Sequence, residues 1–129
     1  MELKGRKKKL GFKRFMESFK YSFEGLKNAY LNEQSMMIHC IITVFVVGLG
    51  FILKINNIEW LIVLIMVGLV MAMELMNTAI EAVVDMVMPD IHPLAKIAKD
   101  SASAAVGVLS LVAFIIGCIV FLPNIISLF

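Results

Sequence analysis

The stretch Glu74-Leu-Met-Asn-Thr-Ala-Ile-Glu-Ala-Val-Val-Asp85 decides the fold of this chain, because it places four polar residues in an apolar run. Glu74, Asn77, Glu81 and Asp85 follow one another at steps of three or four residues. On an α-helix, their side chains fall within about 80° of arc on one face. A carboxylate inside a membrane helix costs on the order of 3 kcal/mol, and such residues usually mark a site. The stretch therefore predicts a helix whose polar face handles cations, phosphate or protons.

The composition indicates an all-α integral membrane protein. The chain has 129 residues, is 60% hydrophobic and has a mean hydropathy of +0.92, far above the value for a soluble domain. Its length allows one domain, residues 1–129. Cys40 and Cys118 lie in separate apolar runs without metal-ligand spacing, so we expect neither a disulfide nor a thiolate metal site.

The apolar runs predict three transmembrane helices, over residues 36–53, 60–85 and 102–122. Only fourteen uncharged residues separate Glu59 from Glu74, which is about 21 Å of helix against a hydrocarbon thickness of about 30 Å. The second span must therefore continue through Glu74, and its polar face lies at one membrane edge. We expect a loop over residues 86–100, with Pro89 and Pro93 as helix breakers.

The N-terminal third predicts an amphipathic helix over residues 10–33, after a basic tail at residues 1–9. Six aromatic or apolar residues recur at steps of three and four, and basic residues occupy the opposite face. The apolar positions are Phe12, Phe15, Phe19, Phe23, Leu26 and Tyr30. Such a helix suits the headgroup region of a membrane. The alternative is a helix packed on other helices of the same protein.

Charge distribution predicts the orientation. Nine of the twelve Lys and Arg residues lie in the first 27 residues, and the loop at 86–100 adds Lys96 and Lys99, whereas the other loop has Lys54 alone. By the positive-inside rule, the N-terminus and the polar face are cytoplasmic. The first long apolar run begins only at Met36, so we expect no cleaved signal peptide. We expect membrane lipids, and no nucleic acid, as the partner of the basic segment.

The polar residues suggest chemistry at the cytoplasmic boundary. Glu74 is a candidate general base, and Glu33 with a carboxylate of the polar stretch could supply the two carboxylates of a Mg²⁺ site. Lys99 and Asp100 offer a cation for phosphates and a carboxylate to orient it.

Structural alternatives stay open for several of these residues. Asn77 could join helices, Asp85 could pair with Lys99 for structural reasons, and His39 is better read as an interfacial residue than as a ligand. The chain has neither a GxxxxGK[ST] motif nor a protein-kinase signature set. These residues alone do not distinguish an enzyme from a proton or cation channel. A purely structural membrane protein would not need a polar face whose burial in the membrane costs so much free energy.

The polar stretch, with His92-Pro-Leu-Ala-Lys-Ile-Ala-Lys-Asp100 and the Ser/Ala-rich run behind it, resembles the prokaryotic diacylglycerol kinase family. Tyr21-Ser-Phe-Glu-Gly-Leu-Lys27 and Asn32-Glu33 resemble that family's N-terminal region. The resemblance covers nearly the whole chain from about Gly11. It implies a three-span lipid kinase that forms homotrimers with active sites between subunits.

The resemblance also implies a role for each site residue. Glu74 would be the general base toward the lipid hydroxyl, Asn77 would position the reacting groups, and Glu33 and Glu81 would hold the Mg²⁺ that accompanies ATP. Lys99 would bind the phosphates and Asp100 would support the site. The remaining residues matched on the nucleotide side are Arg14, Tyr21, Ser22, Asp85 and His92.

The resemblance points to one branch of the family more than the other. The Gram-negative branch has a glutamate where this chain has His39, whereas the string His92–Lys96 is similar to the Gram-positive branch, whose members phosphorylate undecaprenol. The resemblance therefore favours undecaprenol as the acceptor, with diacylglycerol as the alternative.

Overall fold

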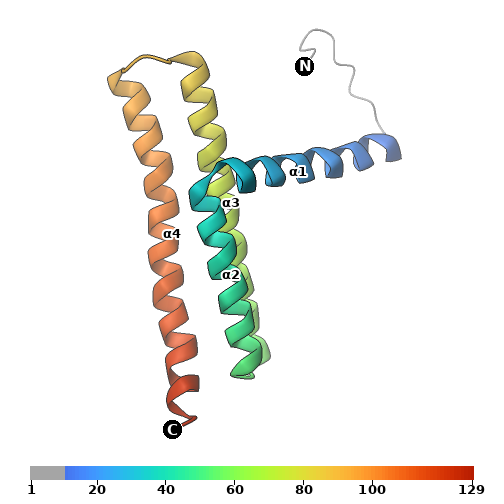
Figure 1. The fold of residues 1–129 in the computed structure, drawn as a ribbon, viewed down its shortest axis with the longest axis vertical. Coiled ribbons are helices and arrows are strands. Elements are labelled where there is room, and N and C mark those ends of the chain that lie inside the picture. Colours follow the sequence, from blue (N-terminus) through green and yellow to red (C-terminus); the bar gives the residue numbers. More distant parts are fainter. Residues whose placement is uncertain (1–10) are drawn as a thin grey trace.

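The computed structural model describes residues 11–129, and all regular secondary structure in that range is α-helical. The predicted basic tail at residues 1–9 lies outside the described part. The four helices are α1 (Phe12–Asn32), α2 (Gln34–Ile52), α3 (Asn57–Val87) and α4 (Pro93–Ile126). Helices α2, α3 and α4 run alongside one another, and α1 projects from them at a steep angle (Figure 1).

Three of the helices, α2, α3 and α4, are long and apolar enough to cross a membrane. The predicted class of an all-α chain with three such helices is confirmed. At most 22% of the residues in the most apolar stretch of any of them are buried inside the chain. Most of this hydrocarbon surface therefore needs lipid or further copies of the chain to cover it.

A single residue separates α1 from α2. Glu33 has extended backbone angles (φ −111°, ψ 113°), which turn the chain from one helix axis to the other. Its N–H donates to the Ala29 carbonyl (2.9 Å) and its own carbonyl accepts from the Met37 N–H (3.2 Å), so helical hydrogen bonding resumes at once. Ala29 and Met36 are buried on either side of the corner and fix it by packing.

A tight turn joins α2 to α3. Lys54 takes a positive φ of 52°, and the Asn56 side chain then accepts from the Glu59 N–H (2.9 Å) while Glu59 accepts from the Asn56 N–H (3.0 Å). This reciprocal pair is a capping box, which satisfies donors that the first helical turn leaves free. Asn56 therefore caps the start of α3 directly after the turn.

The predicted loop at residues 86–100 is wrong in its second half, because α4 begins at Pro93. We expected Pro93 to break a helix, but it occupies the first helical turn, where a missing N–H costs no intrahelical bond. The preceding residue, His92, caps α4 by accepting the Leu94 N–H at Nδ1 (3.1 Å). Lys96, Lys99 and Asp100 therefore lie within α4 and not in a loop.

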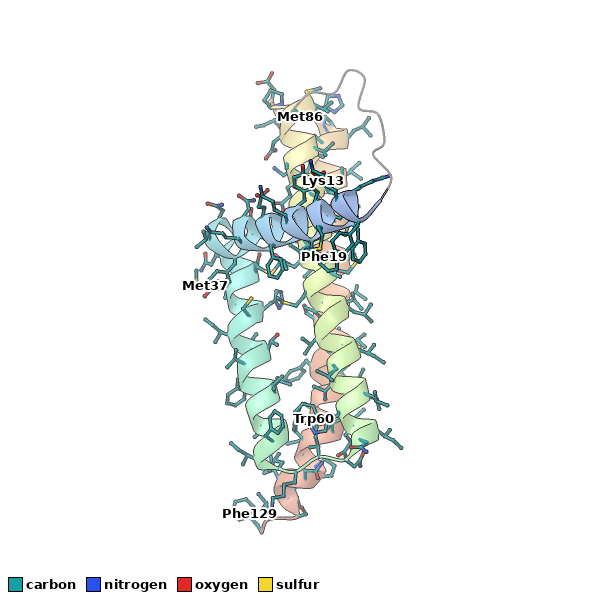
Figure 2. The ribbon with its side chains drawn as sticks, turned by 90° about the vertical axis from the view of Figure 1, so that its right-hand side faces the viewer. Lys13, Phe19, Met37, Trp60, Met86 and Phe129 are labelled. Atoms are coloured by element: carbon teal, nitrogen blue, oxygen red, sulfur yellow. The ribbon has the colours of Figure 1, made fainter. Side chains whose placement is uncertain are left out.

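The best-packed part of the chain lies at the end opposite the α3–α4 connection. Ile55, Val63, Val120 and Phe121 form a buried cluster there. Figure 2 shows Trp60 and Phe129 toward this end and Met86 at the other, with α1 crossing between. Lys13 lies on the side of α1 toward Met86, and Phe19 lies on the side toward Trp60.

Candidate functional site

Glu74 is the one buried charged residue of the described chain, at 3% exposure. It lies in α3 and faces α2. The Ser35 hydroxyl donates to its Oε1, and Nε2 of His39 lies 3.8 Å from its Oε2. Both carboxylate oxygens therefore have a polar neighbour from α2, which offsets part of the cost of burial.

Sequence reasoning did not identify this α2 contact. Ser35 was not singled out, and His39 was read as an interfacial residue, whereas its side chain is 18% exposed and lies against Glu74. The two residues are four apart and so share one face of α2. That spacing is a signal that periodicity analysis could have used, but only the crossing of α2 over α3 shows that the face meets Glu74.

One turn further along α3, Asn77 and Glu81 interact directly. Nδ2 of Asn77 donates to Oε1 of Glu81 at 3.2 Å. The other amide atom, Oδ1 of Asn77, is buried and has no hydrogen-bond partner among residues 11–129. A buried carbonyl oxygen without a partner is rare and calls for a ligand, an ion, water or another subunit.

The last pair on this face joins α3 to α4. Nζ of Lys99 donates to Oδ1 of Asp85 at 2.8 Å, and both side chains are partly solvent-accessible. Asp100 instead pairs with Lys96 on the exposed side of the same helix. Lys99 thus contacts the polar face of α3, whereas Asp100 forms an ion pair with Lys96 within α4.

The other predicted residues lie apart from this cluster. Glu33 forms the α1–α2 corner with a half-buried side chain, and His92 acts as the cap of α4. Arg14, Tyr21 and Ser22 are exposed on α1, where the Ser22 hydroxyl donates to the Ser18 carbonyl at 2.9 Å. These three residues therefore lie on an exposed part of α1, whereas Ala29 at its end is buried.

The oxygen donors suit Mg²⁺ in kind. Mg²⁺ in kinases usually takes one or two carboxylates and completes its shell with phosphate oxygens and water. Glu81, beside the unpartnered Oδ1 of Asn77, provides such hard oxygens. No group of three His, Cys, Asp or Glu residues within residues 11–129 could enclose a metal ion. The site therefore fits a metal that arrives with a phosphate ligand better than a permanently bound ion. Cys40 and Cys118, as expected, are free thiols.

Along α3, the burial of the polar side chains decreases from Glu74 toward Asp85. The series begins with the buried carboxylate of Glu74, continues through the half-buried Asn77–Glu81 pair, and ends at the solvent-accessible Asp85–Lys99 pair. A buried carboxylate next to a cationic side chain is an arrangement that general-base catalysis of phosphoryl transfer can use.

Comparison with known proteins identifies one family of kinases. The family model of prokaryotic diacylglycerol kinase matches residues 20–121. The chain is 38% identical to undecaprenol kinase of Bacillus subtilis over 111 residues, covering 86% of this chain and 90% of that protein. It is also 38% identical to diacylglycerol kinase of Haemophilus influenzae, covering 88% and 98%, and 37% identical to that of Escherichia coli K12, covering 84% and 89%.

Proposed function

The chain belongs to the prokaryotic diacylglycerol kinase family and is a lipid kinase, and from this premise we propose that it transfers the γ-phosphate of ATP to the hydroxyl of undecaprenol. Diacylglycerol, which would give phosphatidic acid, is the alternative acceptor. The similar proteins include kinases named for each lipid at nearly equal identity. The preference for undecaprenol comes from the His92–Lys96 string, which is similar to the undecaprenol branch.

The observation that carries the proposal is the buried carboxylate of Glu74. A lipid hydroxyl is a weak nucleophile, and a base must take its proton as the oxygen attacks phosphorus. Glu74 lies on an apolar helix, where the Ser35 hydroxyl donates to one of its oxygens and His39 lies 3.8 Å from the other. In that position it meets a hydroxyl that enters from the bilayer.

In the proposed reaction, the acceptor oxygen forms a bond to the γ-phosphorus, the bond between that phosphorus and the β,γ-bridging oxygen breaks, and ADP leaves. The acceptor proton moves to a carboxylate oxygen of Glu74. Asn77 positions the reacting groups, Lys99 binds phosphate oxygens, and Asp100 supports the site. Phosphoryl transfer depends mainly on such positioning and charge neutralisation.

Mg²⁺, held by Glu33 and Glu81 together with ATP, would neutralise the phosphate charge. Arg14, Tyr21, Ser22, Asp85 and His92 would contribute on the nucleotide side. Because Arg14, Tyr21 and Ser22 are exposed on α1, movement of α1 or a second subunit would complete the nucleotide side. A homotrimer with sites between subunits provides the second option, and the large uncovered surface of α2, α3 and α4 supports it.

The proposed orientation places α1 and the α3–α4 connection on the cytoplasmic side of the plasma membrane. Lys13 lies on the side of α1 toward the α3–α4 connection, and Phe19 lies on the side toward Trp60. This arrangement suits a helix lying in the headgroup region. ATP would then reach the site from the cytoplasm and the lipid from the bilayer.

A competition assay tests the function. The parent chain in lipid vesicles receives γ-labelled ATP, Mg²⁺ and equal amounts of undecaprenol and diacylglycerol. We expect label mainly in undecaprenyl phosphate, and a loss of about 100-fold or more in Glu74→Gln, the usual scale of a general base. Asp90→Asn, an exposed carboxylate in the α3–α4 connection, is the matched control and should retain the parent rate. Label mainly in phosphatidic acid would reassign the acceptor, and an active Glu74→Gln would refute the base.

A further inference from the structure

A cavity of about 540 Å³ lies between α2, α3 and α4. Its walls are hydrocarbon along nearly their whole length, with lining residues that include Val46, Leu49, Val67, Phe114 and Leu122. Three lining residues, His39, Thr43 and Ser110, have polar side chains. The Thr43 hydroxyl is already used, because it donates to the His39 carbonyl at 2.7 Å.

One end of this cavity adjoins the candidate site. His39 lines the cavity and also faces Glu74, with 3.8 Å between Nε2 and Oε2. From His39 the lining continues along α2 as far as Leu49, which is a distance of about 15 Å at 1.5 Å per residue. The cavity is therefore an apolar channel whose polar end is the imidazole beside the buried carboxylate.

We propose that this cavity holds the part of a polyprenol acceptor's hydrocarbon chain that lies next to the hydroxyl. The proposal rests on the proposed function, since it specifies where the acceptor of that reaction binds. A polyprenol is polar at one end and hydrocarbon along the rest, which is the same order of chemistry as His39 followed by the apolar walls. The volume of the cavity lies within the range of about 300–1,000 Å³ that is typical of small-molecule sites.

The cavity also distinguishes a lipid acceptor with one hydrocarbon chain from a lipid acceptor with two. A polyprenol carries a single chain on the carbon of its hydroxyl, and one channel leading away from Glu74 accommodates the first part of that chain. A diacylglycerol carries two chains on neighbouring carbons, so one of them must lie outside this channel. Occupancy of the cavity therefore contributes more to binding of the polyprenol.

Gly117 provides a substitution that fills the cavity without disturbing the helix. It lines the cavity on α4, seven residues beyond Ser110, and a Cβ added there meets nothing within 4 Å. This places Gly117 about 10 Å further along α4 than Ser110. Gly117→Leu should therefore block the deep part of the channel and leave the Glu74 end open. Gly68→Leu on α3 is the matched control, because a Cβ there also meets nothing and Gly68 is outside the lining.

The test measures phosphate transfer to undecaprenol, diacylglycerol and a short-chain prenol by the parent, Gly117→Leu and Gly68→Leu chains in vesicles. We expect Gly117→Leu to raise the KM for undecaprenol about tenfold or more, because leucine displaces several methylene groups from an apolar site. The KM values for the short prenol and for ATP should stay within about twofold of the parent. Diacylglycerol should be affected less than undecaprenol, and Gly68→Leu should match the parent throughout.

A binding readout separates failure of this inference from failure of the proposed function. A polyprenol with a photoreactive group near its hydroxyl end is irradiated with the parent chain, and the labelled peptides are identified. Label in the lining of α2 and α4 supports the inference even if no phosphate is transferred. Label elsewhere, equal KM values for Gly117→Leu and Gly68→Leu in an active enzyme, or crosslinks that place a second copy of the chain in the cavity would each overturn it.

Discussion

Nε2 of His39 lies 3.8 Å from Oε2 of the buried Glu74 carboxylate, while Ser35, one turn earlier on α2, donates its hydroxyl to Oε1. A separation of 3.8 Å is longer than a direct hydrogen bond, so the imidazole is a polar neighbour of the carboxylate and Ser35 is its hydrogen-bond donor. Helix α2 thus orients the carboxylate that we assign as the base, although it carries no acidic residue of its own within Gln34–Ile52.

His39→Gln should lower kcat about tenfold and leave the KM for ATP within about twofold, because the change disturbs the orientation of Glu74 and not the nucleotide contacts. The measurement is steady-state transfer to undecaprenol at several ATP concentrations. Met37→Gln, on an exposed position of α2, is the control. An unchanged kcat in His39→Gln would show that Ser35 alone positions Glu74.

Glu81→Gln should raise the Mg²⁺ concentration needed for half-maximal rate by about tenfold, because it removes a carboxylate from the proposed metal site. The amide oxygen of glutamine can still accept from Nδ2 of Asn77, so the local fold is retained. The rate is measured against Mg²⁺ at fixed ATP. Glu24→Gln, an exposed change of the same kind on α1, serves as the control. A Mg²⁺ dependence equal to that of the parent would remove Glu81 from the metal site.

Lys99→Met should raise the KM for ATP about tenfold or more and lower stability little. The Lys99–Asp85 pair has side-chain exposures of 39% and 63%, and exposed ion pairs contribute about 0–1 kcal/mol. Kinetics and thermal unfolding in the same detergent are compared with Lys96→Met, whose parent residue is paired with Asp100. The opposite result, lost stability with an unchanged KM for ATP, would support the alternative that Asp85 and Lys99 are a structural pair.

Gly50→Ala should destabilise the end of the bundle opposite the site by about 1–3 kcal/mol, the usual cost of overpacking. A Cβ at Gly50 would lie 2.8 Å from Cη2 and 2.9 Å from Cζ2 of Trp60. That ring is itself packed against Phe51, with 4.8 Å between ring centroids, and so has little room to move.

Gly48→Ala is the matched control for this substitution, because a Cβ there meets nothing within 4 Å. It should leave the unfolding midpoint unchanged or raise it, since alanine is the better helix former by about 1 kcal/mol. Thermal unfolding followed by circular dichroism measures both variants. Equal midpoints for the two would contradict the close approach of Gly50 to Trp60.

Much of the candidate site could be predicted from local sequence, and the reason is periodicity. The steps from Glu74 to Asp85 place four polar side chains on one helix face wherever that helix packs. The start of α4 could not be predicted in the same way, because Pro93 is compatible both with a loop and with the first turn of a helix. The cap by His92 depends on backbone angles that the residue types leave open.

The sequence by itself determined three apolar helices, the polar face of α3 and membership of a lipid kinase family, because composition and helical spacing are properties of consecutive residues. Only the tertiary structure decided which helix faces which. It brought Ser35 and His39 against Glu74, paired Lys99 with Asp85, and opened a cavity between α2, α3 and α4. These relationships depend on how helices far apart in the chain cross and rotate. Apolar surfaces in a membrane protein pack in many registers, so the hydrophobic pattern alone does not select one.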